Sequence, residues 1–100
     1  MGEEFIISAK KSPQGMILVV TDITLVGKYF EEGKRHLDLR NKFYQGEEGS
    51  EGEVRELINQ SYIIHFTGKK IVALGTEIGV ISSNNILIIA GVPHAEAALR

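Results

Sequence analysis

Alternating and continuous apolar positions at the start of the chain predict a β-hairpin. Phe5, Ile7 and Ala9 alternate with polar residues, which is the period of a strand with one buried face. Residues 12–15 (Ser-Pro-Gln-Gly) favour a turn, because proline fixes φ and glycine accepts the last position. Residues 16–21 are then apolar on both faces, so we expect this second strand to lie inside the sheet.

The next segment has the spacing of a helix, carried by three apolar residues: Ile23, Val26 and Phe30. Asp22 can cap this helix and Gly33 can end it. Residues 34–40 alternate again, which predicts a half-buried strand with a charged outer face.

The second half of the chain begins with a segment rich in glycine and glutamate. We expect residues 45–52 to form a mobile acidic loop. Ser50 and Glu53 stand at capping-box spacing, ahead of an apolar helix stripe formed by Val54, Leu57 and Ile58. Residues 62–66 fit either a short strand or the last turn of this helix.

A third helix and a last strand complete the predicted elements. Thr67 can cap a helix that Gly79 ends. Residues 86–90 are predicted to be a final buried strand, and residues 91–94 a structured turn. The order of elements predicts a single α+β domain over residues 1–100. In this domain about three helices pack on a mixed, mainly antiparallel sheet of four to five strands.

Composition narrows the class of protein. The 100 residues are 43% hydrophobic and 24% charged, as in an ordinary folded domain. The absence of cysteine excludes disulfide scaffolds, thiolate metal sites and thiol nucleophiles. The longest apolar runs have five residues and are too short to span a bilayer, and Glu3 and Glu4 stand where a signal peptide would be basic. We therefore expect a cytoplasmic protein without a membrane partner.

Charge is distributed unevenly along the chain. The formal net charge of −2 weakens the case for nucleic-acid binding through overall charge. Locally, residues 28–44 carry a charge of +2 and residues 45–56 a charge of −4, which predicts a basic patch beside the acidic loop. The cationic residues of this basic patch are Lys28, Lys34, Arg35, Arg40 and Lys42.

Two further pairs of residues are candidates for RNA or anion binding. Phe43 and Tyr44 follow the basic strand and can stack on bases; the hydrophobic core is favoured for Phe43, and both roles are open for Tyr44. Lys69 and Lys70 start a predicted helix, whose free N–H groups and dipole favour an anion. A solvated helix end is the alternative interpretation of this pair.

The three histidines are candidates for ligand contact. His36, His65 and His94 are separated by 29 positions in each case, so no short pair places two ligands on one element. We therefore predict no metal site and no cofactor. His36 is predicted to be a surface residue and His65 a partly buried residue with one hydrogen bond. His94 follows Pro93 in a predicted turn, where ligand-contacting residues often lie; a structural cap is the alternative.

Catalytic patterns have little support in this sequence. No Gly-x-Ser-x-Gly elbow is present, and residues 27–28 (Gly-Lys) lack the flanking residues of a phosphate-binding loop. Residues 49–52 formally match the GxxG loop of KH domains, but the four surrounding glutamates would repel phosphate. We therefore assign no catalytic residue.

Three segments carry a family resemblance: residues 26–34 (Val-Gly-Lys-Tyr-Phe-Glu-Glu-Gly-Lys), 43–46 (Phe-Tyr-Gln-Gly) and 91–95 (Gly-Val-Pro-His-Ala). Together with the order of elements, they resemble the archaeal domain-of-unknown-function family 424 from about Phe5 to Ala95. The resemblance implies a small archaeal cytoplasmic α+β protein, a loose link with RNA binding and translation, and no established activity. The positions that match motif places of the family are Gly27, Lys28, Phe30, Glu32, Gly33, Gly91, Pro93 and His94.

Two functional hypotheses follow. The first is a module that binds RNA or a ribonucleoprotein through the lysines and arginines named above, Tyr44 and His94. The second is a protein-interaction adaptor whose acidic loop, Glu47 to Glu53, meets a basic partner without binding nucleic acid. Cations gathered on one face beside an exposed Tyr44 would favour the first hypothesis, and scattered cations the second. The oligomeric state stays open, because the strand at residues 34–40 can be a sheet edge.

Overall fold

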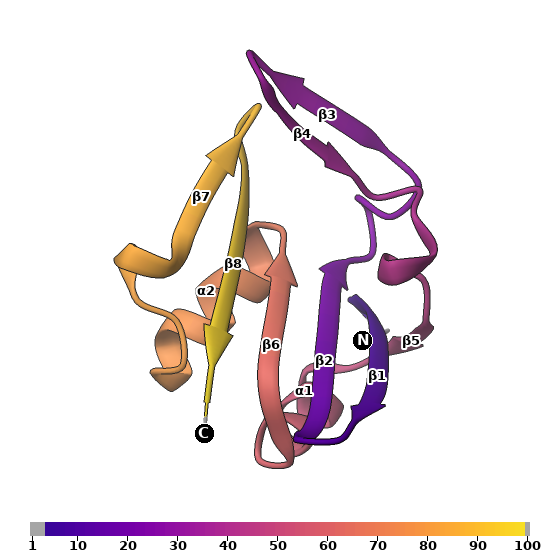
Figure 1. The fold of residues 1–100 in the computed structure, drawn as a ribbon, viewed down its shortest axis with the longest axis vertical. Helices are drawn as coiled ribbons and strands as arrows, with labels where there is room; N and C mark the ends of the chain where they lie inside the picture. The colour runs from indigo at the N-terminus through magenta and orange to yellow at the C-terminus, as the bar shows by residue number, and fades with distance from the viewer. Residues whose placement is uncertain (1–3, 100) are drawn as a thin grey trace.

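The computed structural model describes residues 4–99, and this part of the chain folds as a mixed six-stranded sheet with helices on one face (Figure 1). The strands of this sheet are β1 (Phe5–Ser12), β2 (Gly15–Asp22), β5 (Glu47–Gly49), β6 (Ser61–Thr67), β7 (Ile86–Ile89) and β8 (Val92–Ala98). Their order is β5-β1-β2-β6-β8-β7, and neighbours are antiparallel except β2 and β6, which run parallel. The α+β class and the mixed, mainly antiparallel sheet are confirmed.

The first two strands form the predicted hairpin. Phe5 pairs with Asp22 at one end, and Ser12 pairs with Gly15 beside the turn. β2 lies between β1 and β6, and its residues Leu18 and Val19, which point to opposite faces, are 0% and 1% exposed. The continuous apolar run therefore marks a strand covered on both faces, as predicted.

Two helices, α1 (Glu51–Ile58) and α2 (Lys69–Ile78), cover the same face of the sheet. The main hydrophobic core joins them to the strands through buried residues that include Val54, Ile58, Ile64, Phe66 and Ile71. α1 begins at the predicted capping box: the Ser50 backbone N–H donates to Glu53 Oε1 at 3.0 Å, and the Glu53 N–H donates to Ser50 Oγ at 3.4 Å. α2 ends where predicted, at Gly79 with φ 96°.

The start of α2 differs from the prediction. The N-cap is Gly68, with φ 120°, rather than Thr67. Thr67 is the last residue of β6, and its hydroxyl lies 2.8 Å from His94 Nδ1 instead of meeting the helix. Residues 62–66 belong to β6, so the strand alternative for this segment is the right one.

The predicted helix over residues 23–33 is replaced by turns and a second, two-stranded sheet. In this hairpin β3 (Tyr29–Glu32) pairs with β4 (Arg35–Asp38). Gly27 has φ 89° and Gly33, between the two strands, has φ 62°. These left-handed conformations cannot occur inside a helix, and glycine adopts them without a steric penalty.

A small second core explains why this segment is a hairpin. Phe30 and Leu37 are cross-strand partners, and they pack with the buried residues Leu39, Ile89 and Val92. The hairpin thereby covers one end of the sheet, above β7 and β8 in Figure 1. Because cross-strand pairing buries these residues, tertiary contacts outweigh the helical spacing of residues 23–30. The predicted half-buried strand at residues 34–40 is confirmed in β4.

The predicted mobile acidic loop at residues 45–52 is also wrong. Its centre is β5, whose residues Glu47 and Gly49 pair with Ile7 and Phe5 of β1. At Gly46, an added Cβ would lie 2.1 Å from the Ile7 carbonyl oxygen. Glycine here permits a close approach of two backbones, which is the opposite of a mobile loop.

The C-terminal elements differ from the predicted last strand and turn. β7 is an edge strand rather than a buried one, and Ile88 is 57% exposed. The chain reverses at Ala90 and Gly91, with φ of 52° and 82°, and continues as β8. Pro93 and His94 therefore lie within a strand, not in a turn.

Across residues 4–99 the chain forms two α-helices rather than about three, and the main sheet has six strands rather than four to five. The other helical segments are the short 3₁₀ turns η1 (Lys42–Tyr44) and η2 (Ser83–Asn85). No helix in this described part of the chain is long and apolar enough to cross a membrane.

Candidate functional site

The predicted basic patch lies on and beside the β3–β4 hairpin, and each of its cations is exposed: Lys28, Lys34, Arg35, Arg40 and Lys42. Arg40 is held by Asp38, with Nε 2.8 Å from Oδ1, and its guanidinium lies 4.9 Å from the centre of the Tyr29 ring. This hydrogen-bonded ion pair lowers the pKa of Asp38 below its ordinary value. The positive charge of the hairpin is therefore partly neutralised by carboxylates on the same hairpin.

Lys69 and Lys70 lie on a different element, the first turn of α2. The Lys70 N–H donates to Asp22 Oδ2 at 2.9 Å, and the Ile71 N–H donates to Oδ1 at 3.0 Å. The Lys70 side chain reaches Glu4 at 3.0 Å. Two N–H groups that were expected to attract an external anion are therefore bound to a carboxylate of the protein itself.

Burial dominates the electrostatics of Asp22. Desolvation raises the pKa of this carboxyl, although its bonds to the backbone of Lys70 and Ile71 act in the opposite direction. Asp22 and both lysines line a hollow of about 500 Å³ between the start of α2 and the β7–β8 turn. Because the carboxylate occupies the helix end, this hollow does not offer the open anion site that the sequence suggested.

Tyr44 is half-buried rather than exposed. It packs against the second core, and its ring meets the Phe43 ring edge-on at 5.1 Å. Burial, together with the charge of Glu96, raises the pKa of the Tyr44 hydroxyl. Phe43 in turn meets the His65 ring at 5.1 Å, but it is only half-buried and belongs to neither hydrophobic core, so the core position favoured for it is wrong. The condition that favoured RNA binding, cations gathered beside an exposed Tyr44, is not met.

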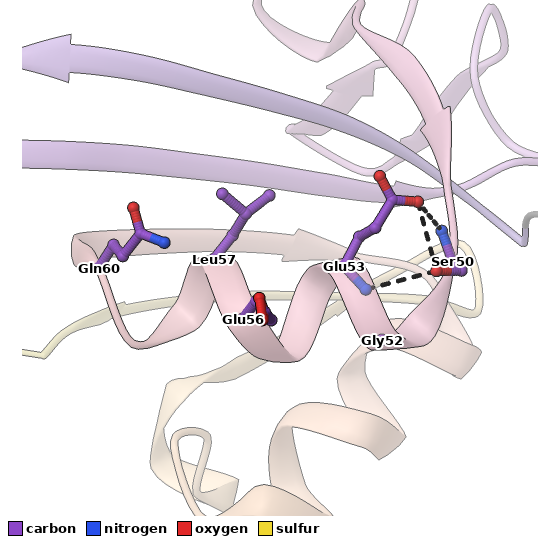
Figure 2. A pocket seen from close by; sticks show the side chains of 6 residues that line it. All are labelled: Ser50, Gly52, Glu53, Glu56, Leu57 and Gln60. Carbon is purple, nitrogen blue, oxygen red and sulfur yellow. Dashed lines mark hydrogen bonds between the residues drawn. The ribbon is translucent and has the colours of Figure 1, made fainter.

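The acidic residues are concentrated at the β5 edge of the sheet, where β5 leads into α1. A hollow of about 600 Å³ lies along α1 (Figure 2), lined by Ser50, Gly52, Glu53, Glu56, Leu57 and Gln60. A second hollow of about 400 Å³ lies between β1, β5 and α1 and is lined by Glu47 and Glu48 of β5. Glu53 and Leu57 line both hollows, so the two adjoin at one face of α1.

Three carboxylates of this acidic surface have no internal partner. Among residues 4–99, the side chains of Glu47, Glu48 and Glu56 form no hydrogen bond or ion pair. Glu53, by contrast, is turned toward Ser50 by the capping box (Figure 2). The acidic surface therefore combines free negative charge with the half-buried apolar side chain of Leu57.

A third feature lies on the face of the sheet opposite α1 and α2. His65 pairs directly with Glu96 across β6 and β8, and Thr67 pairs with His94 two residues further along the same ladder. Glu96 Oε2 lies 3.3 Å from His65 Nδ1 and 3.3 Å from His94 Nε2. The side chains of His65 and His94 are 19% and 13% exposed, whereas that of Glu96 is 59% exposed.

Sequence reasoning missed this histidine–glutamate cluster because residues 91–94 were interpreted as a turn. On a strand, His94 and Glu96 are two positions apart and share a face. That spacing is visible in the sequence once the segment is taken as a strand. The position of His65 beside Glu96 results from the pairing of β6 with β8, and no local sequence pattern indicates which strands pair. His36, on β4, lies outside the cluster, beside the Tyr29 hydroxyl.

These observations define a small α+β sheet domain with an acidic edge and a histidine–glutamate cluster. Residues 10–98 match the model of a protein family described as "Protein of unknown function (DUF424)". The chain belongs to this family, and the resemblance inferred from the sequence motifs is confirmed.

Comparison with solved structures supports the fold. The chain is similar to the crystal structure of an uncharacterized conserved protein from Methanopyrus kandleri, with a TM-score of 0.76 and 19% sequence identity. The likeness covers 96% of this chain and 93% of that chain, and at this identity it shows the fold alone. No curated protein matches the sequence significantly.

Proposed function

We propose that the protein is a small adaptor whose acidic surface, formed by β5 and α1, binds a basic segment of a partner protein. The observation that carries this proposal is the pair of adjoining hollows around Glu53 and Leu57. They are bordered by three carboxylates without internal partners: Glu47, Glu48 and Glu56.

The chemistry of the hollows matches lysine and arginine side chains. These side chains lay an apolar stem along apolar surface and keep a charged end near water. Leu57 and Ile7 offer apolar surface in the second hollow, and the glutamates offer acceptors for ammonium or guanidinium groups. An acidic surface also steers a basic partner during encounter, which makes association dependent on salt.

RNA binding through the hairpin is the other function that the test must separate. Among residues 4–99, the exposed side chains of Lys28, Lys34, Arg35 and Lys42 have no ion-pair or hydrogen-bond partner. These four cations support contact with phosphate, which would weaken steeply as salt rises. The adaptor is favoured because Tyr44 is half-buried and Arg40 is paired with Asp38.

Fluorescence anisotropy distinguishes the two functions. The full chain is titrated into a labelled lysine- and arginine-rich peptide, into the same peptide with its cations replaced by glutamine, and into a labelled single-stranded RNA. The proposal expects salt-sensitive binding of the basic peptide alone. Binding of RNA alone, abolished in a Lys34→Glu/Arg35→Glu variant, would instead assign the function to the hairpin.

A matched pair of variants locates the surface. Glu48→Gln/Glu56→Gln removes two free charges of the acidic surface and is expected to weaken peptide binding by about tenfold. Glu31→Gln/Glu77→Gln removes the same charge from β3 and α2 and is expected to leave affinity within about twofold. Equal losses in the two variants would show that overall charge, not this surface, attracts the peptide.

A further inference from the structure

We propose that His65, His94 and Glu96 bind a divalent transition-metal ion of the zinc type on the face of the sheet opposite α1 and α2, with one coordination position open to solvent. This site shares no residue with the acidic surface of β5 and α1. The metal-site proposal can therefore be tested independently of the adaptor function.

The β-ladder places the three ligands without help from loops. His65 and Glu96 are direct partners on neighbouring strands, and His94 shares a strand and a face with Glu96. One ligand atom from each side chain lies within 4.8 Å of the other two. Because β6 and β8 lie inside the sheet, each flanked by two strands, their backbones hold this arrangement rigidly.

Two of the three ligand separations match those of a zinc coordination shell. In a tetrahedral zinc site with bonds of about 2.0–2.1 Å, neighbouring ligand atoms are about 3.3 Å apart. Glu96 Oε2 lies 3.3 Å from Nδ1 of His65 and 3.3 Å from Nε2 of His94. At 3.3 Å these contacts are longer than the charge-assisted hydrogen bonds of about 2.8 Å that imidazolium and carboxylate commonly form. Two edges of a three-ligand shell are therefore already at the separation that a zinc ion requires.

The surroundings hold both imidazole rings with a ring nitrogen toward Glu96. His65 is packed against the edge of the Phe43 ring, with the two ring centres 5.1 Å apart. Thr67 Oγ1 lies 2.8 Å from His94 Nδ1, so Nδ1–H can donate to the hydroxyl while Nε2 faces Glu96. Metal-binding histidines are commonly oriented by such a bond at the second ring nitrogen.

Exposure differs across the cluster in a way that leaves one side open. The two imidazoles are largely buried, whereas the Glu96 side chain is 59% exposed. Three protein ligands with a solvent-facing side are typical of zinc sites that keep a water or an external ligand in the fourth position. Two imidazoles and one carboxylate also suit zinc, nickel and cobalt better than calcium or magnesium, which prefer oxygen ligands throughout.

The test is titration of chelator-treated, dialysed full-length protein with Zn²⁺ by isothermal calorimetry. We expect one ion per chain with a Kd of about 1 μM or tighter. His94→Ala and Glu96→Gln are each expected to weaken binding by about 100-fold, since each removes one of three ligands. His36→Ala is the matched control, because His36 is the histidine outside the cluster, and it is expected to stay within about twofold of the unaltered protein.

Three further measurements separate ligation from folding. Glu96→Gln changes an exposed side chain and is expected to keep the circular dichroism spectrum of the unaltered protein. Thr67→Val keeps all three ligands and is expected to weaken zinc binding by about tenfold through the orientation of His94. Binding of Co²⁺ should produce the intense visible absorption of a four-coordinate site, and Glu96→Gln should reduce it. Millimolar or non-stoichiometric zinc binding, or equal affinity in His94→Ala and His36→Ala, would overturn the proposal.

Discussion

The carboxylate of Asp22 accepts a hydrogen bond of 3.0 Å from the backbone N–H of Ile71, 49 positions further along the chain. Its other oxygen accepts the N–H of Lys70 at 2.9 Å. A side chain at the end of β2 thus supplies the N-terminal cap that Gly68 cannot provide to α2. This bond ties the parallel pair β2 and β6 to the helix that follows β6.

Loss of this cap should destabilise the fold. Asp22→Ala leaves the buried N–H of Ile71 without an acceptor, and we expect the free energy of unfolding to fall by about 2 kcal/mol. Urea denaturation followed by circular dichroism measures this change in the free energy of unfolding. Asp38→Ala is the control, because Asp38 forms an exposed ion pair with Arg40, and it should change stability little. Equal effects of the two substitutions would contradict the cap.

The same carboxyl should make stability depend on pH. Burial raises the pKa of Asp22 above its ordinary value of 3.8, so the folded protein takes up this proton more readily than the unfolded chain. Its contribution to stability is then largest below the unfolded pKa and is lost as pH rises through the folded pKa. Relative to Asp22→Asn, the unaltered protein should become more stable as the pH is lowered from about 7 to about 4. Parallel pH profiles for the two proteins would refute this.

Two glycines should respond in opposite directions to alanine. At Gly68, with φ 120°, an added Cβ would lie 2.3 Å from Asp22 Cγ, so Gly68→Ala should lower the free energy of unfolding by about 2 kcal/mol or more. At Gly52, in the first turn of α1, the nearest contact is Ser50 Oγ at 3.8 Å. Gly52→Ala should therefore raise stability by about 0.5 kcal/mol, because it restricts the unfolded chain. Thermal or urea unfolding of both variants measures the contrast.

Two buried threonines on neighbouring strands should also differ. Thr21 and Thr67 are paired in the β2–β6 ladder and both are 0% exposed. The Thr21 hydroxyl has no hydrogen-bond partner among the described residues, whereas that of Thr67 meets His94. Thr21→Val should raise the free energy of unfolding by about 1 kcal/mol, and Thr67→Val should lower it by about 1 kcal/mol. Urea titrations of the metal-free protein test the contrast; a loss of stability in Thr21→Val would show that its hydroxyl is satisfied.

Local sequence patterns correctly predicted the features that depend on residues only a few positions apart. The turn at residues 12–15, the capping box of Ser50 and Glu53, and the end of α2 at Gly79 were all predicted. Each depends on backbone geometry or a hydrogen bond between near neighbours, which residue type alone largely determines. The acidic run around β5 was equally visible as composition.

The sequence by itself determined the turn at residues 12–15, the beginning of α1, the end of α2 and the family to which the chain belongs. Tertiary structure alone decided that Asp22 caps a helix 49 positions away, that residues 29–38 pair as a hairpin, and that His65 lies beside Glu96. The physical reason is that strand pairing and long-range caps are chosen by which surfaces can be buried together. The local sequence of a strand or of a helix end does not indicate which distant segment will form hydrogen bonds with it.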